Sequence, residues 1–223
     1  MAAPADNDER RPPDRRARRR AETMAEILDR ALAIMAEEGV AGLTMTRLAR
    51  AMRIQPPSLY KYFPSVNAVY DALFRRGQQE NLATLREAIA RAEPGVPALR
   101  AGLRSLGRWA VDNPVLAQLL FWRPVPGFQP SADAFAAADE VVATLRNALR
   151  QAVDCGQLGP DAASECALAL LSTLHFGVLS QHLANDPNGD WDHGLFTSLH
   201  PTVLDLFEAA YPPPPKSVSP TTS

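Results

Sequence analysis

The stretch IQPPSLYKYF, residues 54–63, carries four hydrogen-bonding side chains within five positions: Ser58, Tyr60, Lys61 and Tyr62. Their hydroxyls and the ammonium group can donate to phosphate oxygens or to the edges of nucleic-acid bases. The prolines before them lack an amide hydrogen, which costs little in the first turn of a helix. The pattern predicts a short helix over 57–62 with Pro56 at its cap, because Pro57 disfavours a helical conformation for the residue before it.

A second group of residues suited to phosphate lies just upstream. Thr44 is a good cap for a helix over about 45–52, and Thr46 and Arg47 fall in its first turn. Amides at a helix N-terminus attract anions, so these three residues are candidate phosphate ligands. Gln55, Pro56 and Pro57 complete the residues expected at the same surface.

Two short helices joined by a turn, behind a longer first helix, form a helix-turn-helix. Apolar residues at steps of three and four predict that first helix over about 20–38, and Gly39 would end it. Leu59 and Phe63, four residues apart, would anchor the last helix, so that its polar side chains point outward, with Tyr60 at the boundary. The major groove of DNA admits one α-helix, and double-stranded DNA is therefore the expected partner.

Charge is divided unevenly along the 223 residues. Residues 1–63 hold 12 Lys or Arg and 9 Asp or Glu, a net charge of +3, whereas residues 64–223 hold 11 and 16, a net charge of −5. The segment RRPPDRRARRR, residues 10–20, contains seven of the arginines. Residues 1–19 are expected to form a disordered basic arm, either a solvated tail or an arm lying in a DNA groove.

The remainder of the chain is expected to be helical. Ala and Leu recur throughout, aromatic residues make up only 7%, and alternating β-branched residues are missing. Helices are predicted over 65–92, 97–112, 114–122, 131–156, 161–185 and 192–210, with a kink or break at Pro201. The expected fold is all-α, with a helix-turn-helix domain over 20–66, a larger helical domain over 67–211 and a disordered tail over 212–223.

Thiol and histidine patterns indicate no metal site or disulfide framework. Cys155 and Cys166 are expected to be reduced. Two histidine pairs repeat a spacing of seven, but no acidic or cysteine partner completes a metal site, so all four are expected to be structural: His175, His182, His193 and His200.

Other classes of protein are also disfavoured. No nucleophile with an adjacent base, phosphate-binding loop or metal-spaced carboxylate pair indicates an enzyme, and no cofactor is expected. The first 20 residues lack the apolar segment of a secretory signal, which favours a cytoplasmic protein. The apolar run over 166–179 is expected to be too short to cross a bilayer and to form a helix buried on nearly all sides.

The segment GLTMTRLARAMRIQPPSLYKYFPSVNAVYDALF, residues 42–74, resembles the DNA-binding signature of TetR-family transcriptional regulators. The matching features are the threonine that opens the second helix, the Leu48-Ala49 pair within it and the Leu-Tyr-x-Tyr-Phe run over 59–63. Three positions depart from the family pattern. Arg53 stands where a small residue is usual, Gln55 and Pro56 where Ser or Thr is usual, and Val66 where a phosphate-binding lysine is common.

The resemblance implies a homodimeric repressor that a small molecule releases from a palindromic operator. The helices over about 161–185 and 192–210 would pair with those of a second chain in a four-helix bundle. The second of them offers seven apolar side chains: Leu195, Phe196, Leu199, Val203, Leu204, Leu206 and Phe207.

A pocket for the effector is expected among the helices over 97–112, 114–122, 131–156 and 161–185. Its expected lining residues are Trp109, Phe121, Trp122, Phe135, His175 and Phe176. Each could instead be an ordinary core or interface residue. For the whole chain the alternative is a helical interaction module whose basic tail binds acidic partners or a membrane surface.

Overall fold

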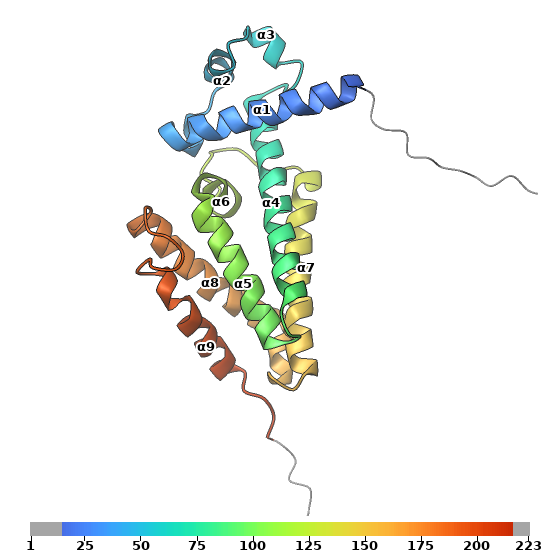
Figure 1. Ribbon diagram of the computed structural model, residues 1–223, viewed down its shortest axis with the longest axis vertical. Helices are drawn as coiled ribbons and strands as arrows, with labels where there is room; N and C mark the ends of the chain where they lie inside the picture. The colour runs from blue at the N-terminus through green and yellow to red at the C-terminus, as the bar shows by residue number, and fades with distance from the viewer. Residues whose placement is uncertain (1–14, 216–223) are drawn as a thin grey trace, which may run out of the picture. The chain divides into compact units, whose positions relative to one another are not determined.

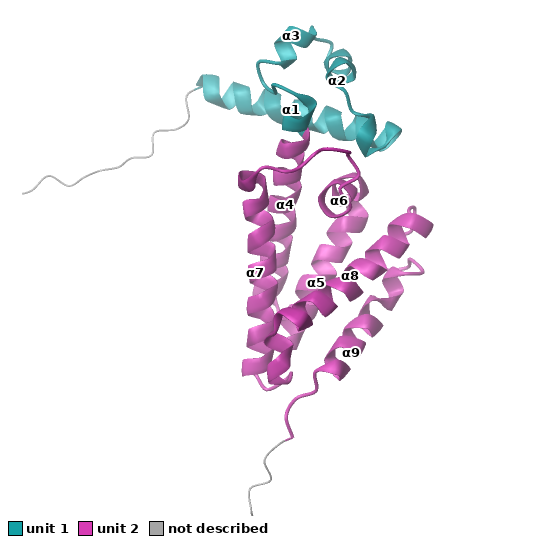
Figure 2. Ribbon diagram, turned by 180° about the vertical axis from the view of Figure 1, so that it is seen from behind, with its two compact units in different colours: residues 1–69 teal, residues 70–223 magenta. Residues whose placement is uncertain are grey.

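Nine α-helices and no strand occur in the computed structural model, which describes residues 15–215. The all-α expectation is therefore confirmed for this part of the chain. The chain divides into two compact units, residues 1–69 and 70–223, shown in teal and magenta in Figure 2. The boundary falls inside α4, Val66–Arg91, so one continuous helix contributes to both units.

The first unit contains α1 (Arg15–Glu38), α2 (Met45–Ala51) and α3 (Pro56–Leu59). The first helix begins five residues before the expected start, because arginine and alanine favour helix and Arg18 pairs with Glu22 one turn later, Nε to Oε1 at 3.0 Å. Residues 15–19, expected to be disordered, are thus helical. Residues 1–14 of the expected arm lie outside the described part.

The three helices enclose a small apolar core. One face of α1 is buried through Ile27, Ala31 and Met35, which follow the spacing of a helix stripe. Leu48 of α2 and Leu59 of α3 are fully buried. Phe63 is also buried just beyond α3, which confirms the expected pair of anchors.

The second unit consists of α4 beyond Val69 followed by α5 (Val96–Asp112), α6 (Pro114–Phe121), α7 (Ala132–Asp154), α8 (Glu165–Asn185) and α9 (His200–Ala210) (Figure 1). Most bounds lie within a few residues of those expected. Its core joins α4, α5, α7, α8 and α9 through buried leucines and aromatic rings, including Leu85, Leu103, Leu149, Leu171 and Phe207.

The last helix is shorter than the predicted span 192–210. Residues 192–196 form turns, Thr197–Leu199 form a 3-10 turn, and α9 begins at His200 with Pro201 in its first turn. Proline is tolerated there because the first amides of a helix have no intrahelical partner. Pro201 was expected inside the helix with a kink or break, but it lies in the first turn of α9, and the helical assignment of residues 192–199 was wrong.

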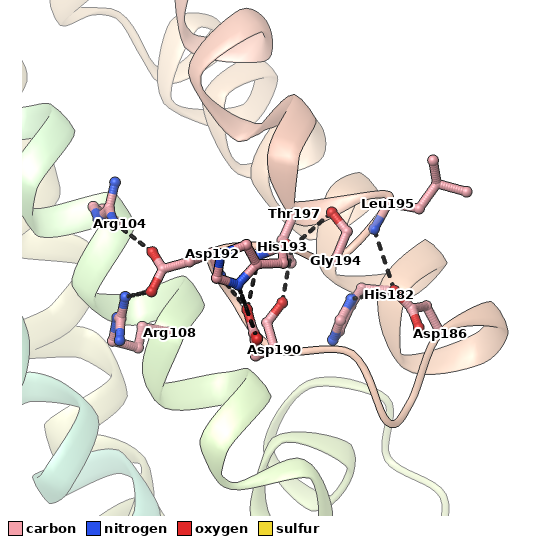
Figure 3. Close-up of polar contacts among 10 residues, drawn as sticks. All are labelled: Arg104, Arg108, His182, Asp186, Asp190, Asp192, His193, Gly194, Leu195 and Thr197. Carbon is pink, nitrogen blue, oxygen red and sulfur yellow. Dashed lines mark hydrogen bonds and ion pairs between the residues drawn. The ribbon is translucent and has the colours of Figure 1, made fainter.

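The connection between α8 and α9 is fastened to α5 (Figure 3). Asp192 accepts from Arg104, Nη2 to Oδ1 at 2.7 Å, and from Arg108 on the next turn of α5. Beside it, Asp190 Oδ1 accepts the backbone amides of Asp192 and His193 at 2.8 and 2.7 Å. The connection before α9 is thus held by these polar contacts and by the buried side chain of Trp191.

The helix α8 differs from the expectation of burial on nearly all sides. It buries one face through residues such as Leu171, His175 and Leu179, while Ala169, Leu170 and Thr173 are exposed. Its 21 residues are long and apolar enough to cross a membrane by length and composition alone, contrary to the expected shortness of this run. Core helices of soluble proteins meet the same criterion, and the buried face of α8 belongs to the core of the helical unit.

Candidate nucleic-acid interface and internal cavity

The start of α2 is built as the sequence predicts. Thr44 has an extended backbone, and its Oγ1 accepts the amide of Arg47 at 3.2 Å. Thr46 is exposed on the first turn. The guanidinium of Arg47 forms an ion pair with Glu38 at the end of α1, so a phosphate would have to compete with that carboxylate for it.

The turn after α2 shows why a small residue is usual at position 53 in the family. Arg53 has a φ of +55°, in the left-handed region that favours glycine. Its amide donates to the carbonyl of Arg50, and the amide of Ile54 donates to that of Ala49, at 3.1 and 3.0 Å. These two bonds form a Schellman motif, which normally has glycine at the position Arg53 occupies.

The beginning of α3 corrects one detail of the prediction. Gln55, with φ −75° and ψ 142°, is the cap, and Pro56 and Pro57 both lie in the first helical turn. The restriction that Pro57 places on Pro56 is a preference, and neither residue needs to donate a hydrogen bond there. Gln55 makes no side-chain capping bond, so its amide is not engaged in holding the helix.

The polar side chains around α3 differ in exposure. Tyr60, expected at the boundary, is 51% exposed, and Lys61 is exposed as expected. Ser58 and Tyr62 were expected to point outward but are half-buried. Leu59 and Phe63 hold the segment from beneath. The exposed hydroxyl and ammonium are therefore presented on a backbone fixed from the core side, as direct recognition of a groove requires.

Arg20 of α1 is a member of this surface that the sequence reasoning placed only in a general basic segment. Its Nη2 donates to the carbonyl of Lys61 at 3.1 Å, and its guanidinium carbon lies 5.1 Å from the centroid of the Tyr62 ring. Arg20 thus helps to position Lys61 and Tyr62, two of the predicted residues. Spacing along the sequence gave no signal for this contact, because 41 residues separate the two partners.

The helix α4 begins beside this surface with Ser65 as its cap, since Oγ of Ser65 accepts the amide of Ala68 at 3.2 Å. Val66 is the first helical residue and is half-buried. The sequence therefore supplies amides at this helix start but no cation at the position where the family commonly has lysine.

The helical unit contains a cavity of about 200 Å³ bounded by α4, α5, α6, α7 and α8. Most of its wall is Ala, Val, Leu and Phe. Three of the six predicted lining residues contribute to it, namely Phe121, His175 and Phe176. Phe121 and Phe176 are in contact, with ring centroids 4.9 Å apart.

The structure places the other three predicted residues elsewhere. Trp109 is buried in α5 beside an open groove that Thr84 and Arg108 also line. Trp122 is partly exposed, and its Nε1 donates to Ser180 Oγ at 3.1 Å. Phe135 packs on Phe74, with centroids 5.2 Å apart.

Two polar residues of the cavity wall were not predicted. Gln78 and Asn81, one turn apart on α4, are buried and line the cavity. A usable signal existed, because they interrupt the apolar stripe of this helix between Leu73 and Leu82.

A pair of buried histidines joins the cavity wall to α9. Nδ1 of His175 lies 3.1 Å from Nε2 of His200, which begins α9 and packs against the ring of Trp191. Burial, with a smaller effect of His200, lowers the pKa of His175 to about 3. Burial and the charges of Arg104 and Arg100 lower the pKa of His200 to about 4. Both rings are therefore neutral at pH 7, and in the bond between them one imidazole donates and the other accepts.

Exposed apolar side chains lie on α8, at Leu170, and on and before α9. Leu195 is 69% exposed, Leu199 50% and Leu206 60%. Of the seven residues predicted for pairing, Leu204 and Phe207 are instead buried in the core of their own chain.

Comparison with protein families gives two matches. Residues 27–73 match the model described as "Bacterial regulatory proteins, tetR family", and residues 99–196 match "Tetracyclin repressor-like, C-terminal domain". A curated relative, the nucleoid occlusion factor SlmA of Glaesserella parasuis serovar 5 (strain SH0165), is 32% identical over 84 residues. That alignment covers 38% of this chain and 41% of the relative, so the chain spans about two fifths of the relative's length.

Solved structures share the arrangement over most of the chain. The protein SCO4313 matches with a TM-score of 0.70 and 25% identity, covering 88% of this chain and all of that one. FadR from Bacillus subtilis, solved in complex with stearoyl-CoA, matches with a TM-score of 0.62 and 16% identity, covering 83% and 97%.

Proposed function

Because the chain belongs to the TetR family of bacterial DNA-binding regulators, we propose that it is a cytoplasmic homodimeric repressor that a small molecule releases from a palindromic operator. The observation that carries the proposal is the pair of exposed side chains, Tyr60 and Lys61, on a segment fixed by buried anchors. A helix presented in this way fits the major groove and can read base edges there.

The phosphate contacts come from the helix starts around that segment. Thr44, Thr46 and Arg47 of α2 and the amides at the start of α4 are suited to one strand of the backbone. Ser58, Tyr62 and the turn at Gln55 to Pro57 contribute the remaining surface.

Dimerisation uses the outer faces of α8 and α9. Three exposed leucines on and before α9, together with the exposed side of α8, form an apolar surface that a monomer leaves in water. Pairing with the same surface of a second chain buries it and presents two recognition helices to two half-sites.

Release is a population shift between two dimer states. A ligand in the cavity touches Gln78 and Asn81 of α4, the helix that continues into the DNA-binding unit. It changes DNA affinity only through its different affinity for the two states, and about 1.4 kcal/mol of difference gives a tenfold effect. The complex of FadR with stearoyl-CoA supports effector binding by a protein of this fold.

The test of DNA recognition is a gel shift and a footprint on the DNA flanking the protein's own gene, repeated across salt concentrations. We expect a palindromic footprint that Tyr60→Ala and Lys61→Ala each weaken about tenfold or more with an unchanged melting temperature. Arg150→Ala, an exposed change on α7, is the matched control and should bind like the wild type. Equal binding by all variants, or binding to any DNA without a footprint, would favour the interaction module with a basic tail.

The test of dimerisation is light scattering on Leu199→Glu and Leu206→Glu, with Ala136→Glu on the exposed side of α7 as the control. The two leucine variants should be monomers that lose operator binding. A wild-type protein that stays monomeric at the concentrations of the gel shift would exclude the proposed dimer.

A further inference from the structure

We infer that the cavity takes an uncharged, compact, largely apolar ligand that carries one hydroxyl-like group, bound by Asn81. The inference rests on the proposed function in that it names the effector class for the same site. Its basis is the wall of the cavity itself: among residues 15–215, no Lys, Arg, Asp or Glu lines it. A charged ligand group placed there would lose its hydration without gaining an opposite charge, which is strongly unfavourable.

The polar atoms of the wall are few and neutral. They come from Gln78, Asn81, Ser172 and His175. Ser172 Oγ already donates to the carbonyl of Leu168 at 2.8 Å, and Nδ1 of His175 is engaged with His200. The ring of His175 is uncharged because burial lowers its pKa to about 3.

Asn81 is a wall residue that can still gain a bond. It is only 2% exposed, and its Oδ1 accepts no hydrogen bond from any residue between 15 and 215. A buried polar atom without a partner is unfavourable, so a ligand that supplies the missing bond gains affinity there. An amide can present either its oxygen or its NH₂, and a hydroxyl, which both donates and accepts, pairs with either.

The volume sets the size of the ligand. A cavity of about 150 Å³ lined by apolar side chains holds a benzene molecule. The cavity here, at about 200 Å³, therefore suits one or two fused rings or an alicyclic skeleton of similar size. Aromatic rings of Phe121 and Phe176 at one wall favour a flat, apolar body.

Three probes of equal skeleton test the inference by calorimetry on the full chain: 2-naphthol, naphthalene and 2-naphthoate. We expect 2-naphthol to bind at least tenfold more tightly than 2-naphthoate, which is charged at neutral pH. Asn81→Leu, a change of similar volume, should weaken 2-naphthol about tenfold and leave naphthalene unchanged. Ala138→Leu, which fills the cavity from α7, should weaken both, whereas Ala136→Leu on the exposed side of that helix should not.

Comparing the three probes on the wild-type chain tests the inferred ligand class even if the Asn81→Leu variant fails to fold. Equal or tighter binding of 2-naphthoate would overturn the inference, as would no binding of 2-naphthol up to its solubility limit. A footprint on DNA together with no binding of 2-naphthol would contradict the proposed ligand class but support the proposed DNA binding. Selective binding of 2-naphthol without a footprint would support the ligand class and contradict the proposed DNA binding.

Discussion

Arg53 shows how a single residue can depart from a pattern and still keep the local geometry. The Schellman bonds at the end of α2 hold it at positive φ, which costs a residue with a Cβ about 1 kcal/mol or more. The end of α7 has the same arrangement of hydrogen bonds, but there the residue at positive φ is Gly156. The departure is therefore a local backbone strain at the turn before α3, and the guanidinium of Arg53 is exposed there.

Replacing Arg53 by glycine should remove that strain. We expect Arg53→Gly to leave the free energy of unfolding unchanged or to raise it by up to about 1 kcal/mol, as measured by urea denaturation. Arg50→Gly, one turn earlier inside α2, is the matched control and should lower it by about 1 kcal/mol. Equal losses in both variants would show that the turn is not strained.

Gly107 is required by a neighbouring ring. A Cβ built at this position would lie 2.2 Å from Cη2 of Trp191, so α5 has no room for a side chain under the indole. Gly107→Ala should displace Trp191 and destabilise the chain by about 1–3 kcal/mol, seen as a lower melting temperature and a red-shifted tryptophan emission.

The cause can be isolated with a double-mutant cycle. In a Trp191→Ala background the Gly107→Ala change should cost little, because the clashing ring is gone. An additive loss in the double variant would contradict the packing explanation.

At the scale of elements, helix positions could be predicted well from apolar spacing and from breakers. The expected anchors Leu59 and Phe63 are buried, and α4 to α8 lie close to their predicted bounds. The failures occurred where a local preference was overruled. Arginine-rich residues 15–19 joined α1, and residues 192–199 were held in turns by Asp190 and Asp192.

The start of α4 makes a prediction about phosphate binding. Val66 lies one residue after the Ser65 cap, where family members commonly carry lysine. Val66→Lys should raise operator affinity and steepen the slope of log K against log salt by about one unit, because one more phosphate is neutralised. The measurement is a gel shift at several salt concentrations, with Asn67→Lys, exposed on the same turn, as a control for general charge. An unchanged slope would remove the argument.

At the scale of the whole molecule, the histidine pair ties stability to pH. The folded-state pKa values, about 3 for His175 and about 4 for His200, lie below the ordinary value of 6.5. The unfolded chain therefore binds more protons between those values, and the free energy of unfolding falls as the pH drops from about 6.5 toward 3. At pH 5 the loss should be about 2 kcal/mol for each ring.

Urea denaturation at pH 7 and pH 5 measures this dependence. A His175→Gln, His200→Gln double variant should lose most of the difference between the two pH values, even if it is less stable at pH 7. A wild-type chain equally stable at both values would show that the pair does not titrate as described.

Tertiary contacts set the limit on prediction of the cavity. The sequence predicts large aromatic side chains and a histidine for its wall, and Phe121, His175 and Phe176 do line it. Sequence could not show that Trp109 and Phe135 pack elsewhere, because those contacts join separate helices.

The exposed leucines on and before α9 also bear on how the proposed dimer would respond to the amount of protein in the cell. When most chains are single, the concentration of pairs varies with the square of the chain concentration, by mass action. Halving synthesis would then leave about a quarter of the DNA-competent species. In the proposed dimer, which buries Leu199 and Leu206 by pairing, the extent of repression would therefore depend on the number of copies a cell makes.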